Sequence, residues 1–558
     1  MKVKKENWNL SELYHSENEW DEKYNYLETR ITNLKSNINF MNINELIKKY
    51  EKILEIRDKL KGYMKLKYDE DNKRGLDIFF NRIQDIDMEI SKLTVIINNK
   101  IIHSKNEIDV SYSRYSDELL ENQEITINSE LFLEINKEIF SSQKNFQKLL
   151  SNIQFDKIND FNNVNHILTL DSYSKYMRSK DRILRKNAFL SIEKSLKDNS
   201  ILLSQYLYNY INNNIKLSKI LGYKKCINRS LNLEEIDSIV YNTCINYINN
   251  NKEIFERYLF IKQKNVGVDK MHIFDLYAPM FQEKNDIITY ENAKKIIKEA
   301  LSVLGKEYIK IVEKIFDEKW VDVYERKNKT NSAYSYNIYA NHPYILVNFQ
   351  YTLNDVFILA HEIGHAVHYY LANNNQSYIN AQVTSLTTEI AAMTNECLVY
   401  KYLLNNNEFN NKEIVGLYLD KFMTILCKQS ILNKFETTLY DEIEVGNKLD
   451  LSKLSKVYVK TIKYYYGDSI VIDGDIYEWA KILHFYKNFQ VYKYLIAFCT
   501  ATNISDNINY ISEDYLYMLK LGRKMNIKKL LKLVKINLEK DNLYKETFNS
   551  FKELMDEI

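Results

Sequence analysis

The sequence predicts a mainly α-helical protein, because helix breakers are scarce and apolar residues recur with helical spacing. Only 2 prolines and 11 glycines occur among 558 residues, and both residue types interrupt helices. Segments 42–68 and 290–316 are long charged-amphipathic stretches, and in 290–316 apolar residues return every three or four positions, which is typical of a helix packed on one face. Abundant Lys, Ile, Asn and Tyr indicate an AT-rich genome, which would also deplete Pro and Gly, and one sequence does not separate the two causes.

Composition and charge are those of an ordinary globular protein. Hydrophobic residues make up 45% of the chain and charged residues 27%, and the formal net charge is +2. Neither nucleic acid nor an anionic membrane is required as a partner by such a charge. The length exceeds the usual size of one compact domain, so we expect two or more subdomains around a shared core.

The cysteines and the N-terminus indicate a reducing compartment. Five cysteines lie far apart and form no C-x-x-C pair, so neither a disulfide framework nor a thiolate zinc site is expected. The basic N-terminus has no apolar stretch behind it, and no run approaches the ~18 apolar residues of a membrane span. We therefore expect a cytoplasmic location.

Secondary structure changes character near residue 332. Helical patterns dominate from about residue 17 to residue 330, whereas 332–349 is rich in Tyr, Ile and Val and is interrupted by Pro343. This segment predicts a strand, a turn or loop, and a second strand. A helix is predicted over 352–375, with Thr352 as its N-cap and Asp355 three residues later, close to a capping box.

The predicted helix over 352–375 carries a metal motif. His361 and His365 are four residues apart, which places both imidazoles on one helix face, one turn from each other. Zinc takes nitrogen, sulfur or carboxylate ligands in tetrahedral geometry, and this pair supplies two of them. Glu362 is placed to act as general base, and Gly364 is small enough to let another segment approach the helix. From 9 His and 75 acidic residues, chance alone predicts ~0.02 such motifs.

A catalytic zinc site needs a third protein ligand and one open position. The histidine of the extended form H-E-x-x-H-x-x-G-x-x-H would fall at Leu371, so that class is excluded. The helical pattern over 385–404 offers Glu389 and Glu396 instead, which are seven residues apart and share a face. One of them could bind the metal while the other orients a histidine, and the spacing alone does not choose between them.

These segments resemble a known family. HEIGHAVHYYL (361–371) followed by TEIAAMTNE (388–396) resembles the thimet oligopeptidase and oligoendopeptidase F family of zinc peptidases, with oligoendopeptidase F the closer branch. The likeness runs over most of the chain. Further matching segments are ENWNLSELY (6–14), YSKYMRSKDRILRKNAF (173–189), DKMHIFDLYAPM (269–280), PYILVNFQYTLNDVFILAHEIGHAVH (343–368) and WAKILHFYKNFQVYKY (479–494).

The resemblance implies a mainly α fold of the gluzincin type. Two helical lobes would enclose a deep channel that admits unfolded oligopeptides, and a small β-sheet would lie beside the zinc helix. Residues 1–170 would form an N-terminal helical region, and residues 171–558 the catalytic region, with the zinc site within 361–396. The resemblance implies one Zn²⁺ per chain and hydrolysis of internal bonds in oligopeptides.

It also implies a role for each residue of the metal motif. His361, His365 and Glu389 would be the zinc ligands, and Glu362 would be the catalytic base. Glu396 would support the ligands from behind.

Three further residues and one strand complete the implied site. His484, Tyr492 and Tyr494 would hold the scissile carbonyl and its developing oxyanion, where one donor is worth on the order of 3 kcal/mol. Residues Ala333, Tyr334 and Ser335 resemble the strand edge against which the substrate backbone pairs.

Two departures from the family bear on the substrate. Segment 517–530 has Gly522 alone where the family has F-L-K-x-G-G-S, and Lys487 and Gln490 replace aromatic residues. Three alternatives to a general peptidase stay open: a zinc-containing peptide-binding protein with little turnover, a peptidase dedicated to maturing one peptide, or a structural protein with an accidental motif.

We expect an oligopeptide as partner and neither nucleic acid nor membrane. We also expect a monomer, because no heptad seam stands out.

Overall fold

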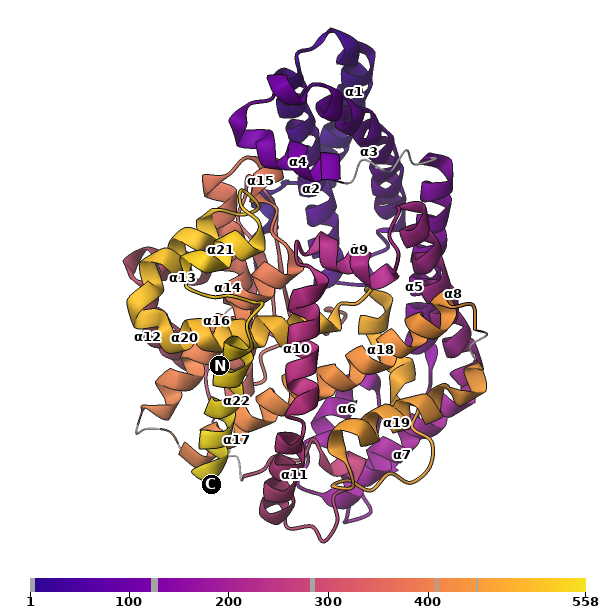
Figure 1. Cartoon of the computed structure of the whole chain (residues 1–558), viewed down its shortest axis with the longest axis vertical. Coiled ribbons are helices and arrows are strands. Elements are labelled where there is room, and N and C mark those ends of the chain that lie inside the picture. Colours follow the sequence, from indigo (N-terminus) through magenta and orange to yellow (C-terminus); the bar gives the residue numbers. More distant parts are fainter. Residues whose placement is uncertain (1–5, 122–128, 282–286, 407–408, 410, 448–449) are drawn as a thin grey trace. The chain divides into compact units, whose positions relative to one another are not determined.

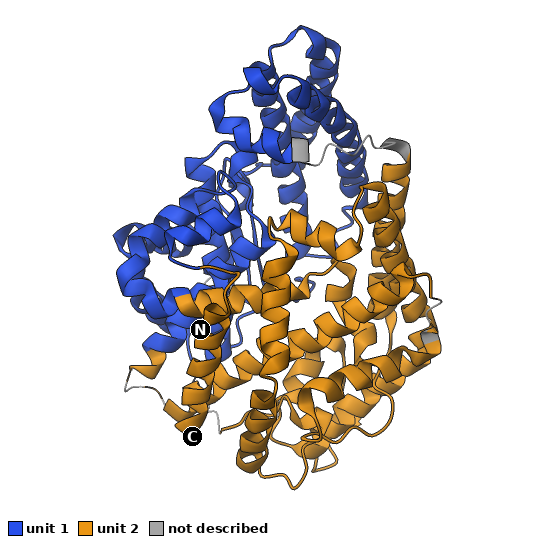
Figure 2. Cartoon of the chain, in the orientation of Figure 1, with its two compact units in different colours: residues 1–124, 286–402, 504–536 blue, residues 125–285, 403–503, 537–558 orange. Residues whose placement is uncertain are grey.

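The structure is a computed structural model that describes residues 6–121, 129–281, 287–406, 409, 411–447 and 450–558. Helices dominate these described residues (Figure 1), so the predicted mainly α fold is confirmed. The chain divides into two compact units, each assembled from three segments (Figure 2). Unit 1 comprises residues 1–124, 286–402 and 504–536, and unit 2 comprises 125–285, 403–503 and 537–558.

The expected boundary at residue 170 was drawn from the family resemblance of the sequence. The two units are defined by contacts in the structure and each combines three segments, so they do not test that boundary, and it stays a prediction. No helix of the described residues is both long enough and apolar enough to cross a membrane.

Unit 1 begins with a helical bundle and continues with the helices around the metal motif. Its helices are α1 (Glu17–Asn37), α2 (Ile43–Glu70), α3 (Asp77–His103), α4 (Ser113–Glu121), α12 (Tyr290–Leu301), α13 (Lys306–Asp317), α14 (Leu353–Asn375), α15 (Tyr378–Ala381), α16 (Ser385–Leu404) and α21 (Ile527–Leu533). Helices α1, α2 and α3 pack on one another (Figure 1). Trp20 lies fully buried between them, and its indole N–H donates to the Leu60 carbonyl at 3.0 Å. Helix α20 (Val491–Lys520) contributes residues to both units.

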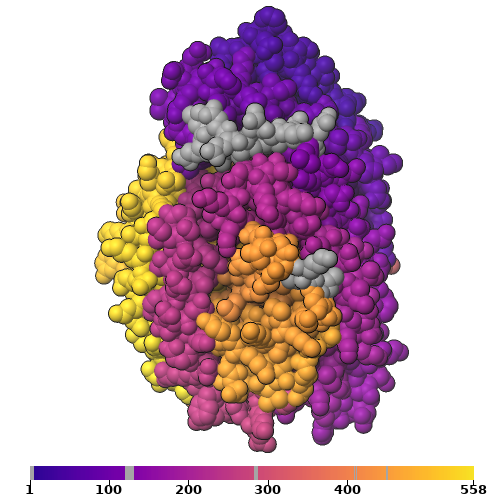
Figure 3. Space-filling model, turned by 45° about the vertical axis from the view of Figure 1, so that its right-hand side comes forward, coloured from indigo at the N-terminus to yellow at the C-terminus, as the bar shows by residue number. Residues whose placement is uncertain are grey.

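Unit 2 is built almost entirely from helices. They are α5 (Ser129–Asn152), α6 (Leu170–Met177), α7 (Arg182–Asp198), α8 (Ser200–Ile220), α9 (Cys226–Leu233), α10 (Ser238–Asn250), α11 (Glu253–Val266), α17 (Asn411–Phe422), α18 (Gln429–Glu444), α19 (Leu454–Tyr466) and α22 (Asp541–Asp556). Two short strands, β1 (Ile158–Asn159) and β2 (Asn165–His166), form an antiparallel pair. Helix α18 contacts α8, and α19 contacts α11, so segments distant in sequence lie side by side. In Figure 3 the orange surface of the later segments accordingly borders the magenta surface of the earlier ones.

A small sheet lies beside the metal-motif helix, as predicted. Its order is β3 (Val321–Asp322), β5 (Tyr344–Leu346), β4 (Tyr334–Tyr336), with β3 parallel and β4 antiparallel to β5. All three residues of β5 are fully buried, which explains the continuous apolar run of the sequence there. Helix α14 packs against both β4 and β5. The capping box between Thr352 and Asp355 is present, so the predicted start of this helix is confirmed.

The segment 290–316 differs from the continuous helix that its periodicity suggests. It forms α12, a 3₁₀ turn (Ser302–Leu304) and then α13. Gly305 stands at the break with φ of 91°, a backbone conformation that residues with a side chain rarely adopt. The apolar spacing continues through the break because both helices bury the same kind of face.

Gly364 lets α16 approach α14 until their backbones nearly touch. A Cβ atom at position 364 would lie 2.6 Å from Ala392 Cα and 2.8 Å from the Ala391 carbonyl oxygen. The segment that the small residue was expected to admit is therefore the helix that carries Glu389 and Glu396.

Replacing Gly364 by Ala should destabilise the protein by about 1–3 kcal/mol, because the α16 backbone must move away. This loss should exceed the helix-propensity gain of about 1 kcal/mol that alanine brings. Chemical denaturation monitored by circular dichroism measures the difference.

The matched control is Gly416→Ala in α17, where the nearest atoms belong to the Phe281 side chain, which can turn away. Equal stabilities of the two variants would contradict the account of the α14–α16 contact.

Candidate metal centre

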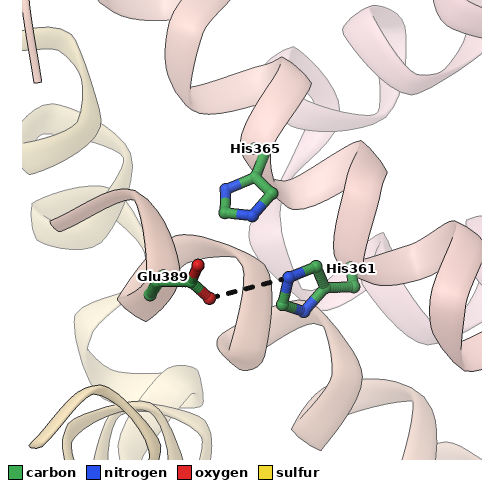
Figure 4. A group of neighbouring side chains, drawn as sticks. All are labelled: His361, His365 and Glu389. Carbon is green, nitrogen blue, oxygen red and sulfur yellow. Dashed lines mark ion pairs between the residues drawn. The ribbon is translucent and has the colours of Figure 1, made fainter. Parts of the chain in front are cut away.

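Three side chains from two helices converge in unit 1. His361 and His365 come from α14 and Glu389 from α16, and one ligand atom of each lies within 4.8 Å of the others. Figure 4 shows both imidazoles and the carboxylate facing one another. Glu389 Oε2 lies 3.7 Å from His361 Nε2. Two imidazole nitrogens and a carboxylate are the donor set of a hydrolytic zinc site with an open position.

The outer nitrogen of each histidine is held by a second residue of α16. His361 Nδ1 lies 2.5 Å from Glu396 Oε1, and His365 Nδ1 lies 3.0 Å from Thr388 Oγ1. Because each Nδ1 is thereby occupied, each Nε2 is left to face the shared space. The spacing had left open which glutamate joins the histidines, and the structure groups Glu389 with them and puts Glu396 behind His361.

Sequence reasoning missed two neighbours of His365. Thr388 is one of them, although it immediately precedes Glu389 in the sequence. The other is Tyr369, one helical turn after His365, whose ring stacks near the imidazole with centroids 6.2 Å apart. The i to i+4 spacing of His365 and Tyr369 was the available signal. His368, by contrast, is buried outside the ligand group, and burial lowers its pKa to about 4.

The electrostatics of the cluster favour a cation. Burial alone would lower the pKa of His361, but the carboxylates of Glu396, Glu389 and Glu362 outweigh burial and raise this pKa to about 9. The pKa of His365 is well below its usual value, because of burial and the neighbouring His361. Three buried carboxylates around two imidazoles leave an excess of negative charge, which a divalent cation would offset. The donor set and its charge thus fit a metal ion.

Glu362 follows His361 on α14 and is only 6% exposed. Its carboxylate is one of the negative charges that raise the pKa of His361. It is not among the three residues whose ligand atoms converge. A carboxylate next to a metal site but outside the ligand set can exchange protons with a water molecule there.

The other expected catalytic residues belong to unit 2. His484 lies in a 3₁₀ turn (Leu483–Tyr486), and Tyr494 lies in the first turns of α20. The Tyr494 hydroxyl is 3.5 Å from His484 Nε2, and the two rings meet edge to face at 5.6 Å. Tyr492 is fully buried instead, and its hydroxyl donates to the Ser230 carbonyl at 3.2 Å. The structure therefore brings Tyr494, not Tyr492, to His484.

The expected substrate-binding residues lie at a sheet edge in unit 1. In the order β3–β5–β4, strand β4 pairs with β5 along one side only, within the described residues. Ala333 is exposed just before the strand, and Ser335 lies at its centre. The Tyr334 hydroxyl donates to the buried carboxylate of Asp69, so this side chain anchors the strand. The outer backbone edge of β4 thus pairs with no other strand among the described residues.

Segment 517–530, which differs from the glycine-rich loop implied by the family resemblance, lies against the connection between α14 and α16. Gly522 has φ of 51°, and a Cβ atom there would collide with the Asn380 carbonyl oxygen. The Arg523 backbone N–H donates to that same oxygen at 2.7 Å. Asn380 belongs to α15, between α14 and α16, so this segment braces the ligand-bearing helices. The single retained glycine stands at the place of closest approach.

Comparison with known proteins places the chain in a family. Residues 175–550 match peptidase family M3. The oligopeptidase PepF of Bacillus subtilis is 27% identical over 99% of this chain and 86% of its own length. An oligoendopeptidase F homolog of Borreliella burgdorferi is 27% identical over 99% of this chain and 97% of its own. The crystal structure of oligoendopeptidase-F from Enterococcus faecium has the same fold, with a TM-score of 0.72 at 22% identity over 97% of this chain and 99% of that one.

The matched segment covers more than half of the chain and includes both ligand-bearing helices as well as the His484 turn. The full-length relatives are named as oligopeptidases or oligoendopeptidases. The chain therefore belongs to peptidase family M3, with its relatives in the oligoendopeptidase F branch, and it is a peptidase.

Proposed function

We propose that the protein is a zinc-dependent endopeptidase that hydrolyses internal bonds of short, unfolded oligopeptides. The observation that carries this proposal is the convergence of His361, His365 and Glu389 within 4.8 Å, with both outer nitrogens already held. Relatives named oligopeptidase and oligoendopeptidase support the substrate class. A cytoplasmic location, a monomeric state and the absence of nucleic-acid or membrane partners remain expectations from the sequence.

His361, His365 and Glu389 would hold the ion, and Glu396 and Thr388 would fix the orientation of the two imidazoles. When bound, zinc would lower the pKa of a water molecule toward neutrality and polarise the scissile carbonyl. The carboxylate of Glu362 takes the proton of the attacking water and passes it to the leaving amine. No covalent acyl-enzyme is involved.

His484 and Tyr494 donate to the oxyanion that develops on the scissile carbonyl. Burial, together with Lys487 and Lys428, lowers the pKa of His484 to about 4, so its imidazole is neutral near pH 7 and one ring nitrogen carries a donor proton. The Tyr492 hydroxyl already donates to Ser230, which supports Tyr494 as the second donor. Such donors stabilise charge that is present only in the transition state.

The open edge of β4 binds the substrate backbone. Residues Ala333, Tyr334 and Ser335 offer backbone N–H and C=O groups to an extended peptide, which would add a strand to the sheet. Only an unfolded segment can lie extended in this way, which accounts for a preference for oligopeptides over folded proteins. Lys487 and Gln490 stand where the family resemblance implies aromatic residues, and this difference favours a second candidate, a peptidase dedicated to one particular peptide.

A mixed library of short peptides tests the function directly. The purified protein should cleave internal bonds of many peptides, spare folded proteins, and lose this activity when a chelator removes zinc. Mass spectrometry identifies the cleaved bonds, and added zinc should restore them.

Cleavage of only one sequence class would favour the dedicated peptidase. If the protein carries one zinc per chain and cleaves no peptide, the enzyme hypothesis is wrong and a peptide-binding protein is favoured. A chain that binds no metal would favour a structural role.

Replacing Glu362 by Gln should lower kcat by at least about 10²-fold, because no other described side chain is assigned to the proton transfer. Zinc content, measured by atomic emission on the purified protein, should stay at one per chain.

Glu389→Gln is the matched control, since it alters a carboxylate of the same cluster that acts as a ligand. This variant should lose zinc and activity together. Near-normal turnover by the Glu362→Gln variant would contradict the role of Glu362 as the general base.

Removal of each tyrosine hydroxyl should have different consequences. Tyr494→Phe should lower kcat by about 10²–10³-fold with KM little changed, because one oxyanion donor is lost. Tyr492→Phe removes only the hydrogen bond to Ser230, so it should cost about 1 kcal/mol of stability while kcat stays close to the wild-type value.

Steady-state kinetics and thermal unfolding of both variants provide the comparison. A larger loss of kcat in the Tyr492 variant than in the Tyr494 variant would reverse the assignment.

A further inference from the structure

The turn that links His484 to Tyr494 has an unusual backbone. Two consecutive residues, Asn488 and Phe489, have φ values of 42° and 57°. Residues with a Cβ atom rarely adopt this left-handed region, and two in succession persist only where the surroundings fix them. The turn sits directly between the 3₁₀ turn of His484 and the start of α20. Its conformation therefore sets how His484 and Tyr494 face each other.

Helix α18 holds this turn through two side chains. Glu436 Oε1 accepts a hydrogen bond of 2.9 Å from the Phe489 backbone N–H. One helical turn later, the Tyr440 ring packs on the Phe489 ring with centroids 4.3 Å apart, and its hydroxyl donates to Asn488 Oδ1 at 3.4 Å. Phe489 itself is 1% exposed. The left-handed pair is thus fixed from one side by a carboxyl and a phenol.

Helix α9 holds the same turn from a second side. The Ser230 hydroxyl donates to the Asn488 carbonyl at 3.3 Å, and the Cys226 thiol donates to Asn488 Oδ1 at 3.3 Å. Tyr492, at the start of α20, donates to the Ser230 carbonyl. Ser230 therefore contacts both the turn and the first residues of α20, and the turn keeps its own contacts with Ser230 and Cys226.

Glu436 places a carboxyl group in the protein interior, where an apolar side chain would suffice for packing. Its side chain is 1% exposed, and Oε2 has no hydrogen-bond partner among the described residues. The charge of Lys493 lowers the pKa of Glu436, but this lysine forms its own ion pair with Glu234 at 2.6 Å. Burial raises the pKa of Glu436 to about 8. A buried carboxyl with one unsatisfied oxygen is costly to the fold, so its presence calls for a role beyond packing.

We propose that Glu436 is a positioning residue for peptide hydrolysis, because its carboxyl holds the Asn488–Phe489 turn so that His484 and Tyr494 donate together to the oxyanion. The inference rests on the proposed roles of His484 and Tyr494. Glu436 acts through the backbone N–H of Phe489, to which its carboxyl is hydrogen-bonded. A displaced turn would separate the two donors, and a shift of about 1 Å in a catalytic group can cost about 10²-fold in rate.

The test compares Glu436→Ala, Glu436→Asp and Glu436→Gln in the full-length, zinc-loaded protein, with a peptide from the library as substrate. The Ala variant leaves the Phe489 N–H without an acceptor, and the Asp variant withdraws the carboxylate by one methylene. Both should lower kcat by about 10–100-fold while KM and zinc content stay close to the wild-type values. Glu436→Gln keeps an oxygen acceptor at the same reach and should retain most of kcat.

A double-mutant comparison separates positioning from a general loss of stability. In the Tyr494→Phe background, Glu436→Asp should reduce kcat far less than it does alone, because both changes remove the same contribution. Asp420→Asn is the matched control, since Asp420 pairs with Lys262 at 2.7 Å in unit 2 and does not contact the turn. It should lower the thermal midpoint with kcat unchanged.

Wild-type kcat in the Asp variant, a change confined to KM, or full additivity with Tyr494→Phe would each overturn the positioning role. If the Ala variant does not fold, the Asp variant carries the same comparison. A Tyr494→Phe variant with wild-type kcat would instead refute the oxyanion assignment of the proposed function, whatever the outcome at Glu436.

Discussion

The candidate metal centre depends above all on the contact between α14 and α16 at Gly364. Because no side chain separates these helices, α16 lies close enough for Glu389 to join the two histidines. The same closeness lets Glu396 and Thr388 hold the outer nitrogens of His361 and His365. The segment at Gly522 and Arg523 then secures the connection between the helices. Ligand geometry is therefore a property of helix packing, and each side chain adds to an arrangement that the backbone already defines.

The residues assigned to the proposed chemistry come from both units of the chain. The metal cluster belongs to unit 1, whereas the His484–Tyr494 pair belongs to unit 2 and has its own support in α9 and α18. Each group is organised by contacts inside its own unit. Under the proposed function, substitutions in one unit would therefore alter oxyanion stabilisation without disturbing metal binding, and the converse would also hold. The kinetic signatures of the two kinds of change are distinct, since metal loss removes activity whereas a displaced donor lowers kcat alone.

Features set by short spacing were predictable from the sequence, and features set by tertiary packing were not. The His361–His365 pair and the Thr352 cap follow from helical geometry and were both predicted. Glu389 and Glu396 share one face of α16, so only the docking of that helix separates their positions. Tyr492 and Tyr494 both follow His484 closely in the sequence, but the Tyr492 hydroxyl contacts Ser230 in the protein interior, and only Tyr494 lies beside His484. The break at Gly305 was hidden because the apolar spacing continues through it.

The contact between α14 and α16 at Gly364 is formed by backbone atoms, which cannot change rotamer as side chains do. Its stiffness means that the three donor groups are gathered during folding rather than by the arriving ion. The entropic cost of assembling a coordination sphere is then already met, and association needs little reorganisation. If the proposed zinc ion is bound there, a protein built in this way would keep its shape when the ion is withdrawn. Occupancy would follow the supply of metal in the cell, and the fold itself would persist through periods of scarcity.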